Sequence, residues 1–177
     1  MSERSKTNNI ILEDATLMFR NFAGREREFN SEGDRNFSVL LEPKLAKAMK
    51  EDGWRVKQLK PREEGEEGDY HLKVNVNYGK GRPPRVVMIT SRGRVDLGAD
   101  EVEVLDWADI KQVDLIVNGW WSDMAGGGYS GFLKSLFVTI NEDDLELKYA
   151  GMPEISEKPP VSEDADSGSD EKDDWNE

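Results

Sequence analysis

The stretch Tyr70–Tyr78 alternates apolar and polar side chains without a break, and this pattern constrains the fold more than any other feature of the sequence. Its polar positions separate five apolar ones, which are Tyr70, Leu72, Val74, Val76 and Tyr78. A period of two places the two sets on opposite faces of a β-strand. The stretch therefore predicts a strand with one buried face and one face toward solvent.

Shorter runs of the same kind predict further strands, separated by Gly, Pro and charged residues that are typical of turns. Pro43 and Gly53 stand where a helix begins and ends, and a helix of about ten residues is predicted between them. Residues 101–110 are ambiguous, with a short helix as one candidate. The further strands are expected at 9–22, 37–41, 54–59, 85–94, 113–121, 129–140 and, as a short closing strand, 145–149.

This order of elements predicts a mainly β fold. About five to seven short strands with turn signals between them are typical of a small barrel or sandwich. We expect a small OB-like β-barrel of about five strands with one or two short helices and a disordered acidic C-terminal tail. The length of 177 residues is enough for one nucleic-acid-binding domain at 1–153, followed by the tail at 154–177.

The composition excludes several classes of protein. The chain has no cysteine and one histidine, His71, which excludes disulfides, thiolate zinc sites and any site with two imidazoles. No run approaches the ~20 apolar residues of a membrane-spanning helix, and the first residues lack the apolar stretch of a signal peptide. We therefore expect a cytoplasmic, non-enzymatic protein with no metal, no cofactor and no membrane association.

Positive charge is concentrated in the middle of an acidic chain. The formal net charge is −13, yet Tyr70–Val95 contains no Asp or Glu and six cations. An edge strand protected by charge is the alternative explanation, but such a density of cations favours a phosphate-binding surface. The cations that would extend this surface are Arg20, Arg25, Arg27, Lys57, Lys60 and Lys134.

Aromatic residues accompany these cations. Binding of single strands without sequence preference needs cations along a groove and ring faces on which bases stack. Burial in the core is the alternative for each ring, but Trp120 and Trp121 are neighbours on a strand, so at least one should leave the core. The predicted DNA-binding residues are Trp54, Lys57, Tyr70, Lys73, Tyr78, Lys80, Arg82, Arg85, Arg92, Arg94, Trp120, Trp121, Tyr129 and Phe132.

Two other groups of residues carry weaker signals. Gly79–Arg82 resembles a phosphate-binding loop, but such a loop precedes a helix and prolines follow here. The carboxylates between Asp96 and Asp109 match neither the spacing of a calcium loop nor that of a two-metal nuclease. We interpret the first as a turn and the second as a solvated acidic surface.

The tail carries ten Asp or Glu and two Lys, a net charge of −8. A tethered acidic segment competes with a polyanion for a basic surface of the same molecule. A solubilising segment is the alternative, but one aromatic residue in an acidic context can serve as a hot spot for a protein partner. The predicted partner-binding residues are Asp173, Asp174 and Trp175.

Five segments together resemble the single-stranded DNA-binding proteins encoded by bacteriophages, which have a divergent OB-fold body and an acidic C-terminal tail that ends near an aromatic residue. The resemblance implies sequence-tolerant DNA binding during phage DNA replication and recombination in the infected host cell, with the tail recruiting replication or recombination proteins. Trp175 departs from this pattern because two residues follow it. The segments are 33–41, 53–57, 70–78, 131–138 and 173–177.

We therefore expect sequence-nonspecific binding of single-stranded DNA. The alternative is a non-enzymatic protein-interaction or structural β module, such as a phage assembly component or a DNA mimic. The sequence leaves the oligomeric state open, and a homodimer is compatible with it.

Overall fold

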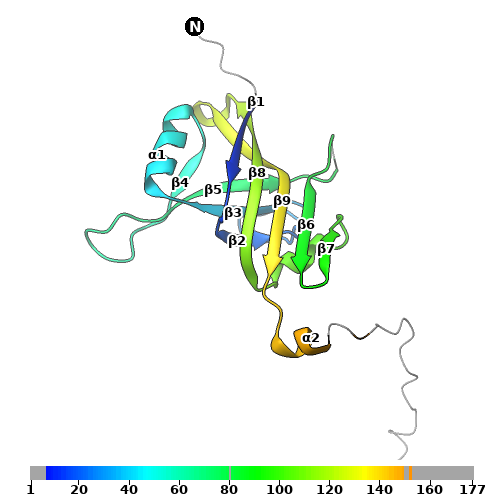
Figure 1. Cartoon of the computed structure of the whole chain (residues 1–177). Helices are drawn as coiled ribbons and strands as arrows, with labels where there is room; N and C mark the ends of the chain where they lie inside the picture. The colour runs from blue at the N-terminus through cyan, green and yellow to red at the C-terminus, as the bar shows by residue number, and fades with distance from the viewer. Residues whose placement is uncertain (1–6, 80, 150–151, 153–177) are drawn as a thin grey trace, which may run out of the picture.

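The computed structural model describes residues 7–79, 81–149 and 152, and within them nine strands form one sheet. Two α-helices, α1 (Pro43–Asp52) and α2 (Asp144–Tyr149), and two 3-10 helices, η1 (Val102–Asp106) and η2 (Met124–Gly126), accompany the sheet (Figure 1). The strands are β1 (Thr7–Leu12), β2 (Leu17–Asn21), β3 (Arg35–Leu41), β4 (Val56–Gln58), β5 (Tyr70–Val76), β6 (Arg85–Thr90), β7 (Gly93–Asp96), β8 (Ile110–Ser122) and β9 (Gly128–Ile140).

Strand β9 organises the sheet because it pairs with three other strands. Along one edge it pairs with β8 in antiparallel register over nearly its whole length. Along the other edge it pairs in parallel first with β5, at Gly131 and Phe132, and then with β6, from Ser135 to Thr139. Figure 1 shows β9 between β8 and β6, with β5 crossing behind them.

The main path through the sheet runs β1-β8-β9-β5-β3-β2, and it is open. Strand β4 pairs with β5, and β7 pairs with β6. The mainly β class is therefore confirmed, whereas the OB-like barrel of about five strands is not. The predicted strand at 9–22 is two strands, because the chain leaves β8 after Leu12 and joins β3 from Leu17.

The core lies on the inward face of this sheet. In β5 the four residues Tyr70, Leu72, Val74 and Val76 are all buried, as the alternating pattern predicted. Phe22 and Phe37 are fully buried and stack on each other, with ring centroids 5.0 Å apart. Such stacked pairs add to the free energy gained from burying the apolar rings themselves.

Two helix predictions have different outcomes. Helix α1 begins at Pro43 and is capped by Gly53, whose φ of 104° and backbone N–H toward the last helical carbonyls end it as predicted. The predicted strand at 145–149 is wrong, because Asp144–Tyr149 is a helix. No strand pairs with this segment in the part of the chain that the structure describes, so its local helical hydrogen bonds take the place of a sheet.

The predicted acidic tail at 154–177 lies outside the described residues. None of the helices in the described ranges is long and apolar enough to cross a membrane.

Close packing of β8 against Trp54 generates a stability prediction. A Cβ atom at Gly119 would lie 2.6 Å from Cη2 of Trp54 and 2.9 Å from the backbone oxygen of Asn8. We expect Gly119→Ala to lower the free energy of unfolding by about 1–3 kcal/mol, because the core must move to admit the methyl group. Thermal unfolding measures this, with Gly79→Ala as the control because its nearest neighbour would be 3.8 Å away. Equal melting temperatures for the two variants would contradict the packing described.

Candidate nucleic-acid interface

The outward face of the sheet carries a row of uncharged polar residues around one aromatic ring. In the strand register Asn75 of β5 pairs with Phe132 of β9, and Phe132 pairs with Asn118 of β8. Asn9 of β1 and Asn36 of β3 extend the row at its two ends. Paired residues share a face of the sheet, so these side chains lie across five strands without an acid among them.

Neighbouring rows on the same face add cations and a second ring. Ser38 of β3 pairs with Lys73, and Ser130 of β9 pairs with Trp120. His71 lies between Leu40 of β3 and Lys57 of β4. We call this surface the acid-free face, and it comprises Asn9, Asn36, Ser38, Leu40, Lys57, His71, Lys73, Asn75, Asn118, Trp120, Ser130 and Phe132.

Four of the predicted DNA-binding residues therefore lie on one surface, and they include two rings. Trp120 is 55% exposed, and Phe132 is half-buried. Lys57 and Lys73 are exposed, and no acid shares their face within the paired strands. This arrangement offers flat apolar surface for bases and positive charge for phosphates.

Three of the predicted stacking rings lie in the core. Trp54, Tyr70 and Tyr129 are each less than a tenth exposed. Trp54 and Tyr129 pack on each other with centroids 5.6 Å apart, and the Tyr70 hydroxyl donates to the Glu67 carboxylate, which also pairs with Lys47 at 3.2 Å. Rings enclosed in this way present no face to a base in this conformation.

Trp121 and Tyr78 are partly buried. Trp121 lies edge-on to Tyr129 at 5.0 Å and donates from Nε1 to Asp123 over 2.9 Å. It points inward while its neighbour Trp120 points outward, as alternation along a strand requires. Tyr78 lies under the Arg35 guanidinium, 5.4 Å from its ring centroid, and burial raises the pKa of its hydroxyl.

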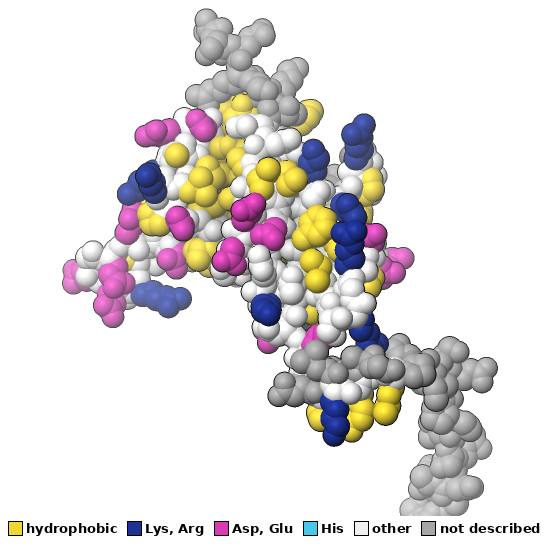
Figure 2. Space-filling model, in the orientation of Figure 1, with side chains coloured by type: hydrophobic (Ala, Val, Ile, Leu, Met, Phe, Trp, Pro, Cys, Tyr) yellow, Lys and Arg dark blue, Asp and Glu magenta, His cyan; other side chains and the backbone are white. Residues whose placement is uncertain are grey.

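The remaining predicted cations belong to the β6–β7 hairpin and the loop before it, and Lys80 lies outside the described residues. Arg85 shares the outward row with Ser135 of β9, pairs with Asp96 at 3.6 Å and lies over the Phe137 ring. Arg82, Arg92 and Arg94 are exposed. Figure 2 shows Lys and Arg side chains gathered over this edge of the sheet.

Lys134 connects the hairpin with the acid-free face. The β8–β9 register skips this residue, since Val117 pairs with Leu133 and Ile116 with Ser135. The resulting bulge lies on β9 between the residues that pair with β5 and those that pair with β6. Lys134 is exposed there, so cations follow β9 from Lys73 past Lys134 to Arg85.

Sequence reasoning missed one aromatic residue beside this face. Phe19 of β2 is 57% exposed, and its ring lies edge-on to His71 with centroids 5.8 Å apart. Its backbone has a φ of 50°, inside an irregularity of the β2–β3 pairing. No sequence pattern reveals a left-handed phenylalanine, because such a conformation depends on the surrounding register.

Two further rings are exposed outside the acid-free face. Phe29 is 92% exposed, in the turn closed by the Arg27–Asn30 bridge, and it follows Glu28. Trp107 is 67% exposed beneath the Arg25 guanidinium, next to Asp106. Asp106 accepts hydrogen bonds from the backbone N–H groups of Phe22 and Ala23, so this carboxylate holds the end of β2.

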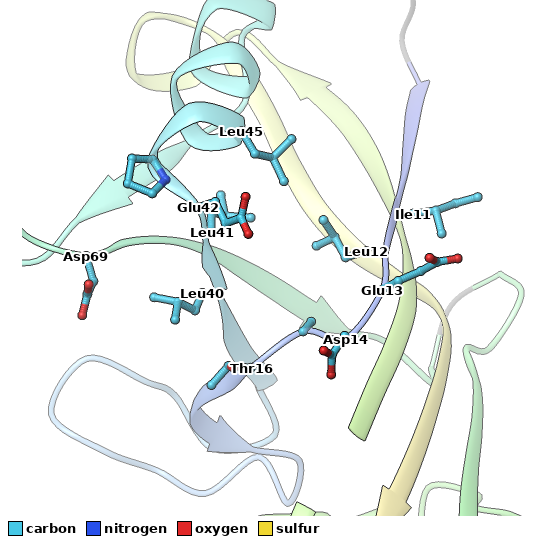
Figure 3. A pocket seen from close by; sticks show the side chains of 12 residues that line it. Ile11, Leu12, Glu13, Asp14, Thr16, Leu40, Leu41, Glu42, Leu45 and Asp69 are labelled. Carbon is cyan, nitrogen blue, oxygen red and sulfur yellow. The ribbon is translucent and has the colours of Figure 1, made fainter. Parts of the chain in front are cut away.

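An acidic cleft borders the acid-free face at Leu40. It has a volume of about 550 Å³ and lies where β1 passes into β2, against β3 and the start of α1. Figure 3 shows the carboxylates of Glu13, Asp14, Glu42 and Asp69 around it, and no Lys, Arg or His lines it. Carboxylates gathered in this way repel phosphates.

No group of three or more His, Cys, Asp or Glu side chains is arranged to hold a metal ion within the described ranges. This includes the carboxylates between Asp96 and Asp109, whose Asp106 instead binds backbone amides.

Comparison with known proteins defines the family. Residues 1–177 match the family described as "Putative phage ssDNA-binding domain", and the chain belongs to that family. This confirms the resemblance inferred from the sequence. No curated protein sequence matches the chain.

Solved structures show a likeness in fold. The single-stranded DNA-binding protein of bacteriophage Enc34 in complex with ssDNA is 12% identical, with a TM-score of 0.51 over 76% of this chain and 88% of that chain. A C-terminal truncation of the Enc34 protein is 10% identical, with a TM-score of 0.49 over 76% and 87%. The single-stranded DNA-binding protein gp2.5 of bacteriophage T7 is 11% identical, with a TM-score of 0.34 over 88% and 100%.

The position of His71 generates a pH prediction. Burial lowers the pKa of this imidazole from its ordinary 6.5, and the Lys57 ammonium lowers it further. The unfolded chain therefore binds the proton more readily, and the stability present above the ordinary pKa is lost as the pH falls below it. We expect the melting temperature to fall more between about pH 7.5 and about pH 5.5 for the wild type than for His71→Gln. An equal fall in melting temperature for the two proteins would show that His71 does not contribute to the pH dependence of stability.

Proposed function

We propose that this protein binds single-stranded DNA without sequence preference on the acid-free face. Membership of the phage ssDNA-binding family over the whole chain carries the proposal. The juxtaposition of Trp120, Phe132 and Lys73 on one face supports this location, because it combines ring surface with positive charge.

The rings, lysines and asparagines have different parts in the proposed binding. Bases stack on Trp120 and Phe132, while phosphates contact Lys57, Lys73 and the exposed Lys134. The strand continues along β9 toward Arg85 and the other cations of the hairpin. The asparagine row supplies uncharged hydrogen-bonding groups that suit any base. Asn36 and Asn75 already donate from Nδ2 within the protein, so their Oδ1 atoms are the groups that remain to accept from a base.

We also infer an OB-like relation between the two ends of the sheet path. Strands β1 and β2 are consecutive in the chain, separated by four residues, 13–16. Within this segment the N–H of Ala15 donates to Val113 of β8 over 2.8 Å, and Thr16 accepts from Leu40 of β3 over 2.9 Å. This segment thus hydrogen-bonds to β8 and β3, the second strand from each end of the path, and these contacts support the OB-like relation.

The proposed setting is the phage-infected host cell, with the protein acting in DNA replication or recombination. We propose a non-enzymatic role for a binding domain at 1–153, and a regulatory and partner-binding role for the acidic tail at 154–177. The charge of that tail supports this division, since it supplies −8 of the total −13. Sedimentation of the protein alone shows whether it is a homodimer.

The salt dependence of DNA binding tests the proposed function. We expect a 30-mer of dT to bind more tightly than duplex of the same length, with log affinity falling linearly against log salt. Replacing Lys73 and Lys134 by Ala should reduce the magnitude of that slope by about 0.7 for each phosphate that the protein no longer neutralises. Fluorescence anisotropy of labelled DNA measures both quantities.

The exposed Lys111 provides the matched control, because it lies at the start of β8, away from the acid-free face. Lys111→Ala should leave the slope unchanged. Absence of binding to the 30-mer at low salt, or tighter binding to duplex, would overturn the proposed function. A slope unchanged by the double substitution would overturn its location.

The acidic tail generates a further prediction. Deletion after Pro153 should tighten DNA binding at low salt, because it removes a tethered competitor with a net charge of −8. The gain should shrink as salt rises, since screening weakens the competing contact. Anisotropy titrations of the full chain and the truncated protein at several salt concentrations measure this difference.

Trp175→Ala is the matched variant for the tail. It keeps every tail charge, so its DNA affinity should equal that of the wild type, while recovery of replication proteins from infected cells should fall. Equal DNA affinity with and without the tail would contradict competition. Equal recovery of proteins by wild type and Trp175→Ala would contradict the partner-binding role.

A further inference from the structure

Phe19 combines exposure with an unfavourable backbone conformation. Its φ of 50° lies in the left-handed region, where a bulky side chain other than glycine is rare and costs free energy. The irregularity between Met18 and Asn21 in the β2–β3 pairing produces this conformation, and such bulges redirect side chains. Phe19 is 57% exposed, so burial of apolar surface offsets only part of the cost.

The ring is held by a buried histidine. His71 is 8% exposed and lies edge-on to Phe19, with ring planes at 68°. Its Nδ1 atom is buried and has no hydrogen-bond partner within the described structure. The imidazole thus contacts one edge of the Phe19 ring, while more than half of Phe19 stays exposed.

The surroundings of this pair suit an anionic strand. Lys57 of β4 lies beside His71 in the register, and Lys73 follows two residues along β5 on the same face. Leu40 of β3 lies on the other side of His71. The nearest acid along β5 is Asp69, which lines the neighbouring cleft.

We propose that Phe19 and His71 form a nucleobase subsite, in which one base stacks on the exposed ring of Phe19 while Lys57 contacts an adjacent phosphate. The inference rests on the proposed function and extends its DNA path from Trp120 and Phe132 across β5 and β3 to β2. The packing of the described residues offsets only part of the cost of holding this ring outward. A ring that is already exposed beside cations gives a base a preformed surface on which to stack.

Phe19→Gly separates a binding role from a structural one. Glycine adopts a positive φ without strain, so the substitution removes the ring and relieves the backbone together. We expect the affinity for a 30-mer of dT to fall by about 5-fold to about 150-fold, the equivalent of one stacked base. The melting temperature should stay equal to that of the wild type or rise. Phe19→Trp, which keeps a stacking surface, should retain affinity.

Phe29→Ala is the control because it removes another exposed phenylalanine, 92% accessible, from a turn outside the acid-free face. It should leave the affinity unchanged. An equal loss in Phe29→Ala and Phe19→Gly would overturn the assignment of the subsite to Phe19.

The single histidine supplies an independent readout. Because His71 is the only imidazole in the chain, its ring C–H signal in an NMR spectrum of the full protein needs no assignment. We expect this signal to shift when the 30-mer of dT is added to the wild type, and to shift much less in Phe19→Gly at saturating DNA. A base stacked on Phe19 changes the ring-current field at His71, whereas a strand confined to Trp120 and Phe132 does not.

DNA binding by the wild type and by Phe19→Gly separates the proposed function from the subsite. If the wild type does not bind the 30-mer, the proposed function is wrong. If the wild type binds and Phe19→Gly binds equally well, with the same His71 shift in both proteins, the subsite is wrong while the proposed function stands.

Discussion

The hydrogen-bonded pairing of β9 with three strands is the constraint on which the rest of the structure depends. Parallel pairing with β5 and β6 requires the chain to cross the molecule between these strands and β9. Strand β8, which precedes β9 in the chain, runs in the opposite direction and pairs with the other edge of β9. The change of partner from β5 to β6 coincides with the bulge at Lys134. One strand thereby places the acid-free face and the basic hairpin end to end.

Close backbone approach makes this arrangement possible. A Cβ atom at Gly131 would lie 3.0 Å from the Lys73 carbonyl oxygen and 3.1 Å from Val117, so glycine lets β5 approach β9 where the two strands pair. Asn75 then donates from its side chain to the Gly131 carbonyl over 3.1 Å. The same contact that joins the two strands thus fixes the middle of the asparagine row.

Period-two patterning was enough to predict the inward face of β5 and the mainly β class. Pro43 and Gly53 were enough to predict helix α1. It was not enough to predict the strand pairs, because alternation defines two faces but does not say which strands share them. Hence Trp54 and Tyr129, which meet in the core, were indistinguishable from Trp120, which is exposed. Phe19 was not predicted for a related reason, since its conformation arises from a bulge in the β2–β3 pairing. The 145–149 segment alternates like a strand yet has no partner among the described strands, and so it is helical.

The distribution of charge explains why a strongly acidic protein is compatible with the proposed DNA binding. At physiological salt, charges farther apart than about 8 Å are largely screened, so a phosphate at the acid-free face senses Lys57 and Lys73 more than the total of −13. The carboxylates of the cleft beside Leu40 repel a DNA phosphate that approaches them. A single strand can stack its bases on the rings and keep its phosphates over the lysines. A duplex has no free base faces and carries a second row of phosphates, so stacking and repulsion both favour the single strand.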